Sequence, residues 1–422
     1  MKVIAENARV QRFVGRQLKR PGYCWGEVRD PRECRGRRWK FKELMNAMLL
    51  GFVSGCGSLR KTERLTKGLG RFGRRYVSRR VPDTTLTDLI PQLSVEELRE
   101  QHIVQVKASW RKKEFKPVGV PCGVVTIDGK GLGALGHSAA GTAQLSRHED
   151  GSQYYLARVF RAVLTSAESR PCIDQRAIGA KTNEVADFIP FYEKLLKSYG
   201  DNNDLFEIVD VDAGMTSKAN AERIYESQKA YVMALKENQP ELLREAERVL
   251  GNRRKADAET PWERYQGRRI QRRLFVTYEM AEYHDWQHLK QVWRVEQISE
   301  HPDGKIEKEQ RYFLSSLHQG RLKPEQILLV VRGHWRVEND CFWSLDVQWS
   351  EDSAPWCRTG RSLEILSWVR LMAYNLVQKI RRRHMRKKLP DGKREAPPAW
   401  DEVFAWINQA WHITPEPVPV RG

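Results

Sequence analysis

The chain has 422 residues, with 73 Lys and Arg against 54 Asp and Glu, so its formal net charge is +19. Its length suits two or three domains, and a hydrophobic content of 40% is typical of a folded protein and excludes a disordered one. No apolar run approaches the roughly 18 residues of a membrane span, and the first residues lack the apolar stretch of a secretory signal. The positive charge favours a polyanion: nucleic acid is the first expectation and an anionic membrane surface the second.

Seven cysteines are scattered along the chain, and none forms a C-x-x-C pair. This pattern argues against a disulfide framework and against a zinc ribbon, and it suits a reducing compartment. We therefore expect a cytoplasmic protein.

The N-terminal region is basic and its pattern is mostly helical. Residues 1–39 are rich in Arg, Gly and Pro, and we expect them to form a loosely packed lead-in. Residues 40–52 carry apolar side chains at helical spacing. Further along, Ser94 and Glu97 form a capping box that predicts the start of another helix.

Basic and aromatic residues are interleaved in RFGRRYVSRR, residues 71–80. Arginine binds phosphate and aromatic rings stack on bases, so this segment is a candidate DNA contact. An ordinary solvated basic face is the alternative. The candidate DNA-binding residues of this segment are Arg74, Arg75, Arg79 and Arg80.

From residue 120 the pattern changes to short apolar segments separated by helices. Residues 122–128 are apolar and β-branched, which predicts a buried strand that ends on Asp128. Residues 205–214 predict another buried strand that ends on acids. Other strands are predicted at 152–166, 170–180 and 230–236, and helices at 184–200 and 217–228. This order predicts a mixed α/β sheet flanked by helices.

Residues 240–320 interrupt this alternation, because they are β-rich, aromatic and basic, and they predict an inserted, mainly β subdomain. Residues 323–347 then predict a long helix with Pro324 in its first turn. Residues 363–388 predict a helix with a strongly basic end, which could bind nucleic acid or be a solvated terminus favoured by the helix dipole.

Glu338 falls on the apolar stripe of the helix predicted at 323–347. Trp335 stands three residues before it and Phe342 four residues after it, so the three side chains share one face. A buried carboxylate is costly unless it is paired or bound to a cation. The alternative is a partly exposed glutamate at the edge of the stripe.

Three acids therefore combine into a candidate site: Asp128 and Asp212 at strand ends, and Glu338 on a helix. If their strands are neighbours, the two aspartates repel each other, which raises their pKa values unless cations lie between them. Carboxylate ligands without a Cys or His cluster suit Mg²⁺ or Mn²⁺, and two such ions roughly 4 Å apart support phosphodiester chemistry. Rival acids are Asp210, Asp346, Glu351 and Asp352.

These residues also resemble a known family, the DDE transposases of the H-repeat-associated insertion sequences. The resemblance rests on TIDGKG around Asp128, VDVDAGMTSKANAERI around Asp212, YVMALKENQP at 231–240 and HWRVENDCFWSLDVQWSED around Glu338. The segment KTNEVADFIPFYEKLL at 181–196 and the N-terminal DPRECRGRRWKFKELMNAMLLGFVSGCGSLRKTERL add to it.

The resemblance implies a ribonuclease H-like core in which Asp128, Asp212 and Glu338 are the catalytic acids and hold two Mg²⁺ or Mn²⁺ ions. It also implies a β insertion between the second and third acids. Further DNA contacts are expected at Lys130, Lys236 and Asn238.

The wider group to which this family is related carries Tyr, Arg and Lys around its glutamate. In this chain those positions hold Val331, His334 and Leu345. We expect His334 or Arg336 to replace the phosphate contact, although His334 could equally be a packed core histidine.

The function that these residues and this resemblance imply is that of a DNA transposase of a bacterial insertion sequence. Metal-dependent cleavage at the element ends would expose 3′-hydroxyl groups, which would attack target DNA without a covalent protein–DNA intermediate. The expected partners are the terminal inverted repeats and target DNA, bound by a homodimer or higher oligomer in the bacterial cytoplasm with the nucleoid. The alternatives are a catalytically silent, domesticated DNA-binding protein of the same fold and a stand-alone metal-dependent nuclease.

The expected organisation has five parts. In chain order they are a helical basic N-terminal DNA-binding domain (1–112), the first part of the ribonuclease H-like core (120–238), the β-rich insertion (239–320), the last part of the core with the helix of the third acid (321–388), and a C-terminal tail (389–422).

Overall fold

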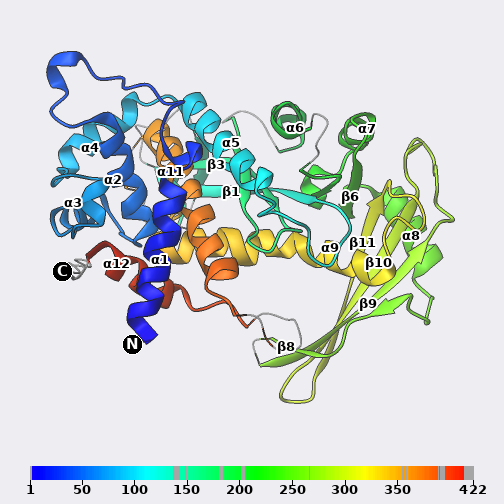
Figure 1. Cartoon of the computed structure of the whole chain (residues 1–422). Coiled ribbons are helices and arrows are strands. Elements are labelled where there is room, and N and C mark those ends of the chain that lie inside the picture. Colours follow the sequence, from blue (N-terminus) through cyan, green and yellow to red (C-terminus); the bar gives the residue numbers. More distant parts are fainter. Residues whose placement is uncertain are drawn as a thin grey trace.

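The computed structural model of the chain describes residues 2–135, 143–147, 150–179, 184–200, 205–265, 267–353, 356–357, 359–387, 389 and 395–412. A large mixed sheet carries helices on its faces, and further helices gather at one end of it (Figure 1). The predicted α/β class is therefore confirmed. Within the described residues, no helix is long and apolar enough to cross a membrane. Parts of the 181–196 motif (181–183) and of the predicted tail (390–394 and 413–422) lie outside the described residues.

Eleven strands of the described chain belong to one sheet. They are β1 (Val124–Leu135), β2 (Gln144–Arg147), β3 (Gln153–Leu164), β4 (Cys172–Ala177), β5 (Ile208–Val211), β6 (Ala230–Leu235), β7 (Ala258–Glu259), β8 (Glu263–Tyr265), β9 (Arg268–Thr277), β10 (Gln291–Glu300) and β11 (Ile306–Ser315). The main path runs β2-β3-β1-β5-β6-β11-β10-β9-β7, with β4 beside β3 and β8 beside β9. The pairs β1–β5 and β5–β6 are parallel and the other pairs are antiparallel.

The strands of the 240–320 segment extend this sheet. Long strands β9, β10 and β11 pair antiparallel with one another, and β11 pairs with β6 from Ser315↔Val232 to Tyr312↔Leu235. The segment begins with helix α8 (Pro240–Leu250). The insertion is therefore continuous with the central strands through main-chain hydrogen bonds.

Side chains of the central strands alternate between the two faces of the sheet. On one face, Val125 and Val209 share a core with helix α6 (Glu184–Tyr199), and α7 (Lys218–Glu226) covers the same face (Figure 1). On the other face, Val124 and Ile208 pack against α9 (Pro324–Arg336). Because side chains repeat with a period of two, Asp128, Asp210 and Asp212 also project toward the α9 face.

The N-terminal helices share their core with the C-terminal ones. They are α1 (Lys2–Leu18), α2 (Phe41–Val53), α3 (Leu59–Lys67), α4 (Asp83–Leu89) and α5 (Val95–Arg111). Their apolar side chains pack in one cluster with α11 (Gly360–Gln378) and α12 (Trp400–His412). The predicted helix start at Ser94 is confirmed, since the Ser94 hydroxyl accepts from the Glu97 N–H, whereas the Glu97 carboxylate accepts from the Arg29 N–H and does not complete the expected capping box.

The expected loose lead-in is wrong for residues 2–18, which form α1. The reason is a long-range contact that the local composition does not reveal: α1 buries Val10 and Val14 and lies along α12. The Asn7 amide donates to Gln409 Oε1 (2.9 Å) across that contact. The helix α12 within the predicted tail is thereby part of the core.

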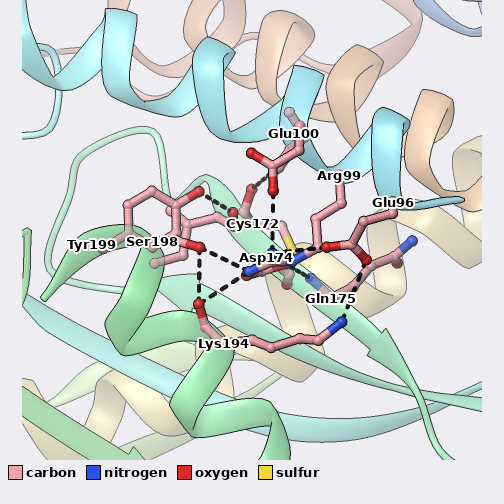
Figure 2. Close-up of polar contacts among 11 residues, drawn as sticks. Glu96, Arg99, Glu100, Cys172, Asp174, Gln175, Lys194, Ser198 and Tyr199 are labelled. Carbon is pink, nitrogen blue, oxygen red and sulfur yellow. Dashed lines mark hydrogen bonds and ion pairs between the residues drawn. The ribbon is translucent and has the colours of Figure 1, made fainter. Parts of the chain in front are cut away.

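A buried ion pair joins α5 to the sheet, as Figure 2 shows. Arg99 donates to both carboxylate oxygens of Asp174 on β4, at 3.1 and 2.6 Å. The same guanidinium donates to the Lys194 carbonyl (3.1 Å) and the Ser198 hydroxyl (2.8 Å) on α6. Asp174 is fully buried. This cluster fixes the helical region to the sheet that carries the candidate site.

Candidate active site

The register of two parallel strands brings Asp128 and Asp212 together. The β1–β5 ladder runs from Val124↔Ile208 to Ile127↔Val211, so Asp128 and Asp212 are the next residues on each side. The prediction that the first strand ends at Asp128 is wrong, because β3 pairs with β1 as far as Leu135. Asp128 lies within β1, one residue beyond the last residue that pairs with the shorter strand β5.

Side-chain hydrogen bonds hold the turn that follows Asp212. The chain enters a 3₁₀ turn (Ala213–Met215), and the Asn238 amide donates to the carbonyls of Ala213 (2.8 Å) and Thr216 (3.2 Å). Asn238 was expected to contact DNA, but the structure uses its amide to shape this turn.

His334, on α9, lies between two acids of the sheet. Its Nδ1 is 3.1 Å from Asp210 Oδ2, and its Nε2 is 3.9 Å from Asp212 Oδ1. Asp210 is buried and its Oδ2 also accepts from the Thr126 hydroxyl (2.9 Å). Asp210, a rival of Asp212 on sequence grounds, is therefore engaged as the partner of His334.

The pKa values of His334 and Asp128 are both raised, but for different reasons. Burial by itself lowers the pKa of His334, but the charge and hydrogen bond of Asp210, with the charges of Asp128 and Asp212, raise it to about 9. His334 is therefore a cation at neutral pH. Burial raises the pKa of Asp128 to about 7; the charge of His334 opposes this rise, and the charges of Glu338 and Asp212 add to it. The raised pKa of Asp128 therefore comes first from burial, and the nearby carboxylates of Glu338 and Asp212 add to it.

Glu338 lies in a π-helical turn (Val337–Phe342) between α9 and α10 (Trp343–Trp349). Its side chain is exposed, so the prediction of a buried position is wrong. The π turn changes the phase of the helix, and Val337 and Cys341 take the buried positions instead. Glu338 lines a cavity of about 510 Å³ together with Asp212, His334 and Lys236.

The other acids near this helix are paired or lie away from the cavity. Asp346 accepts from the Lys130 ammonium at 2.6 and 2.7 Å. Lys130 is buried, so the charge that was expected to contact DNA is already paired. Asp352 is exposed and does not line the cavity that holds Glu338.

Glu351 is fully buried and belongs to a three-membered ion cluster. It accepts from Arg161 on β3 at 2.7 and 2.8 Å and from Arg370 on α11 at 2.8 Å. Burial alone raises the pKa of Glu351, but the two guanidinium groups lower it to about 2. Glu351 therefore joins α10 to its neighbours, and Glu338 remains the helix acid that is open to the cavity.

The expected DNA contacts separate into two places. Lys236 is exposed at the cavity of the acids, and Arg336 lines an adjoining cavity. The segment 71–80 lies in the N-terminal helical region, where Arg80 donates to Glu63 (2.6 Å) and Arg79 packs over Trp39 (4.9 Å). Neither Arg74 nor Arg75 lines the cavity of the acids.

The three candidate acids fit a divalent cation in donor type and in charge. Asp128 and Asp212 are adjacent on the sheet, and their mutual repulsion and that of Glu338 would be relieved by a cation. In the part of the chain that the structure describes, no three His, Cys, Asp or Glu side chains converge tightly enough to enclose a metal ion. The residues therefore supply suitable ligands that would have to draw closer on binding.

The chain is similar to one protein family and to several known proteins. Residues 123–376 match the family described as Transposase DDE domain. Two proteins of Escherichia coli (strain K12), named H repeat-associated putative transposase YhhI and Putative protein YbfL, are each 35% identical to the chain over 81 residues, 19% of this chain and 20% of the relative. The match thus spans about a fifth of the length of these relatives. A cryo-EM structure of a piggyBac transposase synaptic complex with hairpin DNA aligns with 97% of this chain and 77% of that chain, at 13% identity and a TM-score of 0.36.

Proposed function

The chain belongs to the transposase DDE domain family, and we propose that it is the DNA transposase of a bacterial insertion sequence, with Asp128, Asp212 and Glu338 as its catalytic acids. The observation that carries this proposal is the β1–β5 register, which makes Asp128 and Asp212 neighbours. Glu338 lines the same cavity as Asp212. The rival acids Asp210 and Asp346 have their own partners.

We also propose that the centre of the sheet is a ribonuclease H-like core. The support is topological: β3 and β1 are antiparallel, β1, β5 and β6 are parallel, and helices α6 and α7 follow β4 and β5. Asp128 stands on β1, Asp212 comes directly after β5, which lies between β1 and β6, and Glu338 comes after the long helix α9.

Two Mg²⁺ or Mn²⁺ ions bound by the three acids would activate the attacking oxygen and stabilise the leaving oxygen of a phosphodiester. Asp128, Asp212 and Glu338 would hold them. His334 keeps Asp210 paired and places a positive charge beside Asp212, and Lys236 offers a second cation at the cavity. Both cations attract the phosphate backbone of DNA toward the acids.

The reaction that suits this site is cleavage at the ends of the element, which leaves 3′-hydroxyl groups, and transfer of those ends to target DNA. The partners would be the terminal inverted repeats and target DNA, held by two or more copies of the chain. The net charge of +19 supports a DNA partner.

The experiment uses purified protein and labelled DNA that carries the sequences flanking the coding region, with Mg²⁺, with Mn²⁺ or with EDTA. We expect the wild type to nick and join this DNA only with metal. Asp128→Asn, Asp212→Asn and Glu338→Gln should each abolish both steps and keep DNA binding. Asp352→Asn, which changes an exposed acid outside the cavity, is the matched control and should stay active.

Two results would contradict the proposal. If one of the three variants remains active, that acid is misassigned. If the wild type binds the DNA and never cuts it, the catalytically silent DNA-binding protein becomes the better account, and cutting without joining would indicate a stand-alone nuclease.

A further inference from the structure

A second cavity, of about 760 Å³, adjoins the one that holds Asp212 and Glu338. Arg311 on β11 and Trp335 on α9 line both cavities, and the Arg311 guanidinium carbon lies 4.5 Å from the centre of the Trp335 ring. This stacked pair is therefore the common wall. A ligand in the second cavity would lie next to a ligand in the first.

The second cavity is strongly basic. The lining holds a single carboxylate, Glu263, and five arginines, which are Arg264, Arg272, Arg311, Arg332 and Arg336. Glu263 already accepts two hydrogen bonds from Arg332, at 2.9 and 2.8 Å, and lies 3.7 Å from Arg272. Positive charge therefore remains in excess after the internal pairs are formed.

Two of these arginines keep their charge available. Among the residues that the structure describes, no ion pair is found for Arg264, which is exposed, or for Arg336, which is half-buried. Like charges held this close repel one another, so an anion bound among them would stabilise the folded chain.

Arginine is the side chain best suited to a phosphate, because its planar fork donates two parallel hydrogen bonds. The five guanidinium groups come from β8, β9, β11 and α9, so they surround the cavity from more than one side. A phosphodiester backbone is the polyanion that the neighbouring acids would act on.

We propose that this arginine cavity binds the phosphate backbone of the DNA segment that adjoins the bond held at Asp128, Asp212 and Glu338. The inference rests on the proposed function, because it takes DNA as the substrate of the acids. Arg264 and Arg336 make the contacts, while Arg332 and Arg272 are held in place by Glu263.

The test compares the double variant Arg264→Gln/Arg336→Gln with Arg248→Gln/Arg254→Gln, which removes the same charge from two exposed arginines, one on α8 and one just after it, that line neither cavity. Binding of a fluorescein-labelled duplex with the flanking sequence is measured by anisotropy in EDTA over a range of NaCl concentrations. We expect the cavity variant to lose about tenfold in affinity and to lower the slope of log K against log salt by about two, one for each phosphate contact. The control should keep the slope of the wild type.

A second variant separates charge from folding. Arg264→Lys/Arg336→Lys keeps both charges, so it should keep the wild-type salt slope, and all variants are compared by thermal unfolding. The proposal is overturned if the Gln variant binds like its control or if the Lys variant loses the slope as well.

The measurement in EDTA is independent of cleavage. If the wild type cuts DNA with metal and the Gln variant binds DNA like the control, the proposed role of the arginine cavity is overturned and the proposed function stands. If the wild type never cuts DNA and the Gln variant has a lower slope of log K against log salt, DNA binding in the arginine cavity is supported and transposase activity is contradicted. A wild type that binds no DNA overturns both.

Discussion

His334 on α9 and Asp210 on β5 are joined by a contact of 3.1 Å between Nδ1 and Oδ2. The two residues are 124 positions apart in the chain, and each stands a few residues before a candidate acid. The contact therefore sets the helix that leads to Glu338 against the strand that leads to Asp212. Because Asp210 is buried, we expect its contact with His334 to affect the stability of the folded protein as well as the geometry of the site.

The first prediction is that His334→Ala destabilises the protein by about 3 kcal/mol, because it leaves the buried Asp210 carboxylate without its cation. The double variant His334→Ala/Asp210→Asn removes the stranded charge and should recover part of the loss. Urea unfolding of the three proteins measures the difference. Equal stability of the single and double variants would contradict the role of Asp210 as the ion-pair partner of His334.

The second prediction concerns the pair that fixes α5 to the sheet. Arg99→Met leaves Asp174 buried and unpaired, and we expect a loss of about 3 to 5 kcal/mol in the free energy of unfolding. The matched control is Arg248→Met, which breaks the exposed pair with Glu245 on α8 and should change the stability much less than Arg99→Met does. Similar losses in both variants would contradict the assignment of Arg99 and Asp174 as a buried anchor.

The third prediction is a pH dependence from His102, which is buried on α5 with Nε2 at 3.0 Å from the Cys172 carbonyl. Burial, with smaller contributions from the charges of Arg99 and Lys379, lowers the pKa of His102 to about 4. The unfolded chain, with an ordinary histidine pKa near 6.5, takes up the proton first as the pH falls. The stabilising contribution is therefore complete above about pH 6.5 and is lost toward pH 4, by roughly 3 kcal/mol.

His102→Gln is the variant that isolates this effect, because its amide can still donate to the Cys172 carbonyl and does not titrate. Denaturant unfolding at several pH values between 7 and 4 gives the slope for each protein. Other groups contribute equally to both, so the wild type should lose more stability than the variant on acidification. Parallel curves would show that His102 is not held neutral.

The positions of the strands could be predicted because the signal is local. The β-branched residues around Val125 and Val209 mark buried strands, and their adjacency follows from the crossover topology. The alternation in VDVD, which can be read from the sequence alone, also places Asp210 and Asp212 on the same face of the strand. The partner that distinguishes them, His334, comes from a helix far along the chain, and spacing does not reveal it.

The failures share one cause, which is a contact or distortion that depends on the folded chain. Glu338 was placed on a buried stripe because a regular period was assumed, and the π turn changes that period after Arg336. Lys130 was expected to contact DNA, and Asp346, 216 positions away, neutralises it. The composition of residues 1–39 gave no sign that α1 packs on α12.

The last prediction uses two glycines of β1, Gly131 and Gly133, between which the β1–β3 register shifts. Gly133 has a φ of +123°, and a Cβ there would lie 2.8 Å from the Asp352 carbonyl oxygen, a main-chain atom that cannot easily move. A Cβ at Gly131 would meet only the Leu156 side chain, at 3.2 Å. Gly133→Ala should therefore cost about 1 to 3 kcal/mol, and Gly131→Ala less.

Urea unfolding of the two variants beside the wild type tests this difference, since both add one methyl group to the same strand. The strained variant should also cleave DNA more slowly, because a shift of β1 at the bulge moves Asp128 relative to Asp212. Equal stability of the two variants would contradict the close approach of β1 to the chain that follows Glu351. A larger loss for Gly131→Ala would show that packing of Leu156, and not backbone conformation, limits this strand.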